Sequence, residues 1–194
     1  MSARPKGKNR RMSSTSTHGF ALLQSGVGTY LAMNFEAPNA PLPVRAMTLD
    51  PDGIPVIGML WQLMPDKTLQ NRATGYILEI EGLQTGRKIP VVCGERGAGY
   101  TRKGVADAAQ WSLTADNEIV NRSNGYLLTV RNGSNKTRTE VWCNYKMPLI
   151  GTTAAQRWFF RPYEGEPKAP LYPVNPKFEH LFKNQADKRF GTKI

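Results

Sequence analysis

The chain has 194 residues, 40% of them hydrophobic, and a formal net charge of +11. This length is enough to bury a core without disulfides or metals, so a globular domain with extensions is expected. No apolar run approaches the length of a membrane span, and no apolar segment follows the basic start as a secretory signal would require. We therefore expect a cytoplasmic protein.

The positive charge is concentrated at the two ends of the chain. Residues 1–12 contain five bases and no acid, and residues 168–194 contain six bases and two acids, which leaves a net charge of only +2 on the residues between. Bases clustered in this way are typical of segments that bind phosphate or acidic surfaces. The body of the chain is close to neutral.

Residues 1–18 combine bases with a Ser/Thr cluster and almost no apolar side chains, so nothing offsets the entropy cost of ordering them. We expect a basic arm that is flexible or bound to something anionic. From Gly19 onward, twelve short apolar runs follow one another, separated by turn sequences such as PDG and NGSN. None is long enough for a typical helix, so residues 19–164 are predicted to form an all-β domain.

One stretch of sequence occurs twice in this domain, at Trp61–Ile80 and at Trp111–Val130. Over their first eighteen residues the copies are identical at eight positions without a gap, where about one identity is expected from average residue usage. A third tryptophan, Trp158, continues the series at spacings of 50 and 47 residues. Three units are too few to close a β-propeller. The pattern predicts a β-trefoil of three roughly 48-residue repeats, in which six strands form a barrel and three hairpins cap it.

The residues that recur between the copies are expected to build the fold rather than bind a ligand. Tryptophans at repeat spacing are predicted to lie in the core. Arg72 and Arg122, which follow Asn71 and Asn121, are predicted to serve turns or backbone carbonyls.

Residues 165–194 form a second extension, rich in proline and in bases. The prolines predict an extended, partly polyproline segment. The sequence NPKFEHLFKNQADKRF that follows can form one short helix with Phe178, Leu181 and Phe182 on a common face. Two alternatives stay open, because this face can pack on the barrel or dock on a partner.

Catalytic and metal-binding chemistry has few candidate residues. Cys93 and Cys143 each lie eighteen residues after the glycine of their own copy, so they are expected to point apart and to remain free thiols. They lack the spacing and the histidine partners of a zinc site. The only histidines, His18 and His180, lie in the extensions, so the barrel cannot hold a histidine-based triad. We expect no enzymatic activity, no metal and no cofactor.

The three tryptophans end the sequences MLW at 59–61, AQW at 109–111 and QRW at 156–158, and the strands GYILEI and GYLLTV follow the first two. This pattern resembles the ricin B-type, or R-type, lectin module, a β-trefoil marked by Gln-x-Trp near the end of each repeat. Only QRW keeps the glutamine. The resemblance covers residues 19–164 and implies a non-catalytic carbohydrate-binding module whose partner is a glycan or glycoprotein.

In that family a repeat holds a sugar with an acid in its second strand, an aromatic ring in the next strand and polar side chains before its tryptophan. A carboxylate accepts hydrogen bonds from sugar hydroxyls, and an aromatic ring covers the apolar face of the sugar. The first repeat has Ala32 and Met47 at the first two places, so its site is expected to be lost. The second has Glu79 but Gly94 in place of the ring.

The third repeat keeps the most of this pattern. Thr129 stands in the acidic place, Glu140 and Trp142 lie in the following strand, and Gln156 precedes the tryptophan of the repeat. Trp142 has no counterpart in the other repeats and is the candidate for an exposed ring. The carbohydrate-binding residues implied by the resemblance are Glu140, Trp142, Gln156, Thr129 and Glu79.

A second hypothesis treats the trefoil as a structural or interaction module whose sugar sites have decayed. The arm at 1–18 and the tail at 165–194 would then anchor it to a large assembly such as a virion shell or a ribonucleoprotein, because clustered bases bind phosphate and acidic surfaces. The protein would in that case reside within a larger particle. The first hypothesis assigns ligand binding to the third repeat, and the second assigns partner binding to the two ends of the chain.

Overall fold

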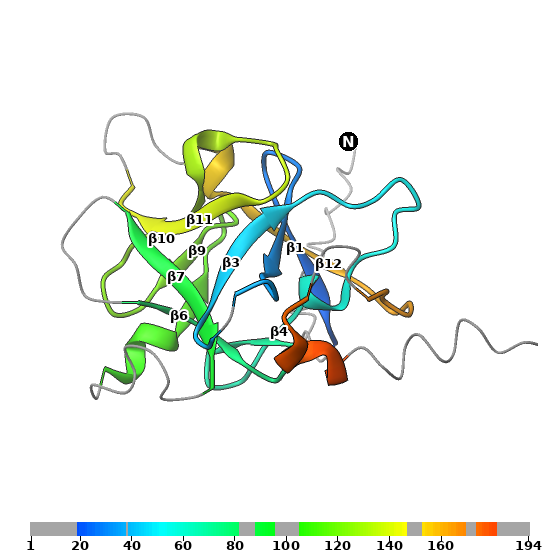
Figure 1. The fold of residues 1–194 in the computed structure, drawn as a ribbon. Coiled ribbons are helices and arrows are strands. Elements are labelled where there is room, and N and C mark those ends of the chain that lie inside the picture. The colour runs from blue at the N-terminus through cyan, green and yellow to red at the C-terminus, as the bar shows by residue number, and fades with distance from the viewer. Residues whose placement is uncertain are drawn as a thin grey trace, which may run out of the picture.

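The computed structural model describes residues 19–37, 39–81, 88–95, 105–146, 153–169 and 174–181, so the arm at 1–18 and the end of the tail lie outside it. Within the described ranges the chain forms twelve β-strands and several short 3-10 turns, with no α-helix (Figure 1). No helix in these ranges is long and apolar enough to cross a membrane. The prediction of an all-β fold is confirmed.

The strands fall into three consecutive groups of four. The first group contains β1 (Ala21–Ser25), β2 (Tyr30–Met33), β3 (Leu42–Met47) and β4 (Leu60–Leu63). The second contains β5 (Leu69–Asn71), β6 (Ile77–Ile80), β7 (Ile89–Gly94) and β8 (Trp111–Leu113). The third contains β9 (Ile119–Asn121), β10 (Leu127–Val130), β11 (Thr139–Asn144) and β12 (Trp158–Pro162). A 3-10 turn precedes the last strand of each group, namely η1 (Ile57–Met59), η3 (Ala106–Ala109) and η5 (Ala154–Gln156).

The first and last strands of the three groups form a barrel. β1 pairs with β12 and with β4, β4 pairs with β5, and β8 pairs with β9, all antiparallel. Isolated bridges from Thr68 to Gln110 and from Glu118 to Arg157 complete the circuit. Closure of the barrel leaves these strands without open edges, which protects their backbone groups from pairing with other chains.

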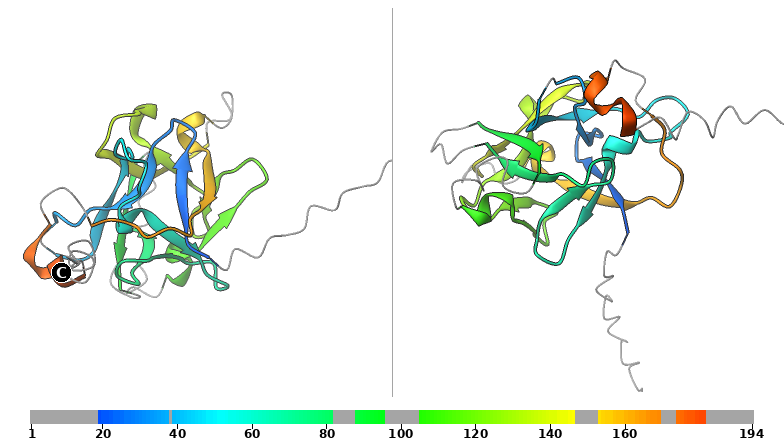
Figure 2. Two further views of the ribbon diagram at one scale, coloured as in Figure 1. Left: turned by 90° about the vertical axis from the view of Figure 1, so that its right-hand side faces the viewer. Right: turned by 60° about the horizontal axis from the view of Figure 1, so that its bottom comes forward.

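The second and third strands of each group form a hairpin, and the three hairpins cap the barrel. β2 pairs with β3, β6 with β7, and β10 with β11. The inner strands β3, β7 and β11 also pair with one another, and Figure 1 shows them side by side. This arrangement of a barrel and three hairpins is the predicted β-trefoil, and Figure 2 shows it from two further sides.

A buried tryptophan joins the barrel to the hairpin layer in each repeat. Trp61, Trp111 and Trp158 are at most 1% exposed. Each indole N–H donates to a backbone carbonyl in the second strand of its own repeat, at Leu31, Leu78 and Leu128, over 2.9, 2.8 and 2.8 Å. A buried indole N–H needs a partner, so these equivalent bonds explain why tryptophan recurs. The prediction of three core tryptophans is confirmed.

A buried asparagine holds the turn that follows the fifth and ninth strands. The side-chain amides of Asn71 and Asn121 donate to the carbonyls of Gly58 and Ala108 at 2.9 Å, and their oxygens accept from the backbone two residues further on. The role in turns and carbonyl contacts that the sequence predicted for Arg72 and Arg122 is therefore performed by the asparagines that precede them. The guanidinium of Arg72 instead lies 5.3 Å from the ring centroid of Phe20.

The proline-rich extension packs on the barrel where the structure describes it. Phe178, in the 3-10 turn η6 (Pro176–Leu181, orange-red in Figures 1 and 2), is 3% exposed, and its ring centroid lies 6.1 Å from that of Phe35. Of the two alternatives for this apolar face, packing on the barrel is confirmed for Phe178, although the turn is a 3-10 helix. The side chain of Leu181 and all of Phe182 lie outside the described residues.

A buried lysine also fastens this extension. Lys168 is 3% exposed, forms a parallel bridge with Val56, and its ammonium group is bound by Asp50 and Asp52. Burial alone lowers the pKa of Lys168, but hydrogen bonds to the two aspartates and their negative charges outweigh this effect, so the pKa is raised overall. The first part of the tail is thus a structural component of the domain.

Candidate functional site

The third repeat contains an open hollow with a cavity volume of about 470 Å³. Three of the five predicted site residues line it, namely Thr129 on β10, Trp142 on β11 and Gln156 in η5. The structure also places Lys88, Asn132 and Asn144 in the wall. We call this feature the third-repeat hollow.

The alternation of side chains along β11 turns Trp142 outward. Its neighbours Val141 and Cys143 are 2% and 0% exposed, whereas Trp142 is half-buried. Successive residues of a strand point to opposite faces, so Trp142 shares the outer face with Glu140 and Asn144. Trp142 is the one tryptophan of the chain that lies outside the core.

The strand register corrects the positions that the sequence comparison assigned to the aromatic ring. Thr129 pairs with Trp142, whereas Ala32 pairs with Arg45 and Glu79 with Val92. Arg45 and Val92 are therefore the counterparts of Trp142, and the predicted Met47 and Gly94 are the counterparts of Asn144. The error is a slip of two residues, which keeps every side chain on the same face and so leaves the alternating pattern unchanged.

Two cations lie against the ring of Trp142. Lys88 Nζ is 5.0 Å from the ring centroid, and the guanidinium carbon of Arg131 is 5.4 Å from it. Both distances are within the range of a cation–π contact. A ligand that approaches this ring consequently meets positive charge as well as an apolar surface.

The polar atoms of Thr129 and Gln156 are directed to protein groups. The Thr129 hydroxyl donates to the carbonyl of Leu127 at 2.8 Å. The Gln156 side-chain oxygen accepts from the backbone of Thr153, and its nitrogen lies 3.4 Å from the carbonyl of Tyr145. Gln156 is also only 4% exposed. Both residues line the hollow, and Gln156 also caps η5 through its contact with Thr153.

The other two predicted residues lie outside the third-repeat hollow. Glu140 accepts a hydrogen bond from Arg131 at 3.0 Å and lines a neighbouring depression. Glu79 is 0% exposed in the second repeat. Burial raises the pKa of the adjacent Cys93 thiol, and the negative charge of Glu79 raises it further. The structure thus divides the five predicted residues among three places.

Sequence reasoning did not single out several residues of the hollow. Asn144 lies two residues after Trp142, so the period of a strand could have placed it on the same face. Lys88 and Asn132 come from segments outside β11, and only the fold brings them to the hollow. Asn132 has a φ of 52°, in the left-handed region that asparagine tolerates better than most residues.

The described residues include neither a metal-binding cluster nor a reactive thiol. No group of three or more His, Cys, Asp or Glu side chains there could hold a metal ion. Both cysteines are free and buried, and burial raises the pKa of each thiol, so neither is a nucleophile near neutral pH. The prediction of free thiols is confirmed.

No protein-family model and no curated protein matches the chain, but solved structures match its fold. The designed threefold-symmetric protein ThreeFoil aligns with a TM-score of 0.60 and 20% identity over 75% of this chain and 99% of that one. The C-terminal half of an earthworm R-type lectin, solved in complex with GalNAc, aligns with a TM-score of 0.54 and 10% identity over 75% and 99%. The β-trefoil lectin of the Vibrio vulnificus hemolysin/cytolysin, solved with N-acetyl-D-lactosamine bound, aligns with a TM-score of 0.55 and 15% identity over 76% and 97%.

Several of the matching structures are lectins, and one is an exo-β-1,3-galactanase of Clostridium thermocellum, of which the matched part covers 30%. At identities of 10–20% such matches establish a shared fold. Function depends on the residues of the site rather than on the fold. The chain has the β-trefoil fold of the ricin B-like lectins, as the resemblance of its sequence predicted.

Proposed function

We propose that this protein is a non-catalytic carbohydrate-binding module and that its principal site is the third-repeat hollow. The observation that carries the proposal is the outward-facing Trp142 at the wall of that hollow. A flat aromatic ring covers the apolar C–H face of a sugar, and this contact is a large part of the binding energy of a shallow site.

The amide groups around the ring complement the hydroxyls of a sugar. Asn132 and Asn144 line the hollow together with Trp142. An amide side chain offers both donors and an acceptor, so it can bond neighbouring hydroxyls of a ring that lies on the tryptophan. The lectin neighbours, among them one solved with GalNAc, support this class of ligand at the level of the fold.

The composition of the hollow favours binding over hydrolysis. Glycoside hydrolysis normally uses two carboxylates that flank the scissile bond. The described residues that line the third-repeat hollow include no aspartate and no glutamate. A module with such a site would hold a saccharide without cleaving it.

A glycan array with the full-length chain and its Trp142→Ala variant tests the proposal. We expect the wild type to bind a defined set of saccharides and the variant to lose about tenfold in affinity, which corresponds to a loss of ~1.4 kcal/mol for the aromatic contact. The matched control is Phe159→Ala, which removes another half-buried ring that carries an arginine at 5.4 Å, on β12 away from the hollow. The proposal fails if no saccharide binds, or if the two variants behave alike.

A further inference from the structure

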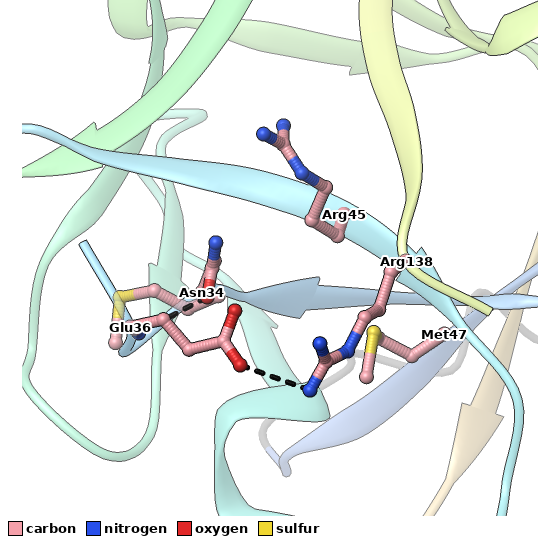
Figure 3. A pocket seen from close by; sticks show the side chains of 6 residues that line it. Asn34, Glu36, Arg45, Met47 and Arg138 are labelled. Atoms are coloured by element: carbon pink, nitrogen blue, oxygen red, sulfur yellow. Dashed lines mark hydrogen bonds and ion pairs between the residues drawn. The ribbon is translucent and has the colours of Figure 1, made fainter. Parts of the chain in front are cut away.

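Two further depressions extend in series from the third-repeat hollow. The first has a volume of about 190 Å³ and lies between Asn34, Glu36, Arg45, Met47 and Arg138 (Figure 3). The second has a volume of about 440 Å³ and is also lined by Arg45 and Arg138, together with Arg131, Asn132 and Glu140. The second depression adjoins the third-repeat hollow at Asn132, and the first adjoins the second at Arg45 and Arg138. We call the two additional depressions the basic furrow.

The charges of the basic furrow are unbalanced. Its two carboxylates are each bound to an arginine, Glu36 to Arg138 at 2.9 Å and Glu140 to Arg131 at 3.0 Å. Arg45 has no carboxylate within 4.0 Å among the described residues, and its guanidinium donates only to the neutral carbonyl of Val44. In Figure 3 this guanidinium points away from the Glu36–Arg138 pair. The furrow therefore contains a half-buried cation that no described anion neutralises.

The register places Arg45 within reach of a ligand on Trp142. Arg45 on β3 is the direct cross-strand partner of Glu140 on β11, and Trp142 is two residues further along β11 on the same face. Diagonal neighbours of this kind have their Cα atoms about 7–8 Å apart, within reach of long side chains. The Lys88 ammonium lies on the far side of this arrangement, against the ring of Trp142. A saccharide on the ring can thus extend one substituent toward Arg45.

The furrow also contains two residues in an unusual backbone conformation. Arg138 and Asn132 have φ angles of 63° and 52°. The left-handed region is disfavoured for a side chain as large as arginine. Strained backbone of this kind is enriched at binding sites, and Arg138 lines both depressions of the furrow.

We propose that the basic furrow binds a negatively charged substituent, a sulfate or a carboxylate, of the saccharide that is held at Trp142. This inference rests on the proposed function and specifies its ligand class. In the position where the family pattern has an acid, the first repeat has Ala32, and Ala32 pairs with Arg45. The carboxylate of the pattern is thus replaced by an alanine, and the place that Trp142 has in the third repeat is taken by Arg45. A guanidinium pairs with planar or tetrahedral anions through parallel hydrogen bonds.

The two carboxylates in the furrow favour a single anionic group over a polyanion. Glu36 and Glu140 flank Arg45 and would repel a continuous row of phosphates. A lone sulfate or carboxylate can contact Arg45 while both acids stay bound to their own arginines. The furrow is accordingly suited to an acidic saccharide rather than to a nucleic acid.

An array of matched pairs tests the inference with the full-length chain. Neutral glycans are printed beside their sulfated and their sialylated derivatives, together with a homopolymeric RNA. We expect the acidic member of a pair to bind about tenfold more tightly, since a charge-assisted bond to arginine adds to the same ring contact. In Arg45→Gln the affinity for the acidic glycan should fall to that for its neutral partner, and the affinity for the neutral glycan should stay unchanged. Sulfated and sialylated members show which anion is preferred.

Two further variants separate the site from general charge. Arg161→Gln removes an exposed arginine that stacks on Phe159, and it should leave the preference for acidic members intact. Arg138→Gly removes a second arginine of the furrow and relieves its positive φ, so it should weaken acidic binding without a loss of thermal stability.

The outcomes are distinct for the two proposals. Equal binding of neutral and acidic members, still sensitive to Trp142→Ala, overturns the anionic site and leaves carbohydrate binding intact. An effect of Arg161→Gln equal to that of Arg45→Gln also overturns it, as does RNA binding that is stronger than glycan binding and lost in Arg45→Gln. Absence of all saccharide binding overturns the proposed function, and the anionic site falls with it.

Discussion

The three equivalent tryptophan bonds lead to a quantitative prediction about stability. In Trp61→Phe, Trp111→Phe and Trp158→Phe the aromatic ring stays, but the indole N–H is lost. A buried carbonyl then loses its donor, which costs about 1–3 kcal/mol. Phenylalanine is also smaller by roughly 40 Å³, and at ~24 cal/mol per Å³ of cavity this adds about 1 kcal/mol. Each variant should therefore lose about 2–4 kcal/mol of unfolding free energy.

The three costs should agree with one another to within about 1 kcal/mol, because burial and bond length hardly differ between the repeats. Urea titration followed by circular dichroism measures them, provided that unfolding is two-state. Trp142→Phe is the matched control, since its half-buried indole lies outside the core, and it should cost less than about 1 kcal/mol. A core variant that loses under 1 kcal/mol, or a control that loses as much as the core variants, would refute the argument.

Three further predictions concern residues outside the tryptophan layer. Asn121→Ala should lose about 2 kcal/mol of unfolding free energy, measured by thermal melting, because the carbonyl of Ala108 is left without its donor. The control Arg122→Ala, at an exposed position, should change the unfolding free energy by less than about 0.5 kcal/mol. Equal losses in the two variants would contradict the role given to the asparagine. The raised pKa of Lys168 means that its ion pairs with Asp50 and Asp52 stabilise the fold fully from neutral pH up to the ordinary lysine value of about 10.4, and that this stabilisation is lost as the pH rises through the raised value. The stability difference between wild type and Lys168→Met should thus be constant from neutral pH to about pH 10 and shrink above it, and a difference that already declines near neutral pH would rule this out. Cys93 and Cys143, whose pKa values burial raises, should react with a thiol reagent near pH 8 only after unfolding, and fast labelling of the folded protein would show that the thiols are accessible.

The repeat pattern could be predicted from the sequence because each repeat solves the same packing problem with the same residues. A tryptophan that must donate to a carbonyl 30 to 33 positions earlier tolerates little change. An asparagine that closes a turn is equally constrained, as Asn71 and Asn121 illustrate. Short alternating runs then indicate strands by their period alone. Fold class, repeat number, core tryptophans and free cysteines all follow from such local regularities.

The candidate site could be predicted only in part. The outward position of Trp142 was predictable because one aromatic residue lies out of phase with the buried residues of its strand, which is a local signal. Glu79 and Gln156 have residue types suited to sugar binding, yet the fold buries both. Burial depends on what other segments cover a residue, so a pattern in its own strand does not reveal it.

By itself the sequence determined the β-trefoil, its three repeats and the outward ring of the third repeat, because these depend on periodicity and on residues that serve one backbone bond. Only the tertiary structure decided the register of the hairpin strands, since a slip of two residues preserves every face. It also decided which cations lie beside Trp142, that Arg45 lies opposite Ala32, and that Lys168 and Phe178 of the tail belong to the domain. These features join segments far apart in the chain, and contacts of that kind are set by packing rather than by local pattern.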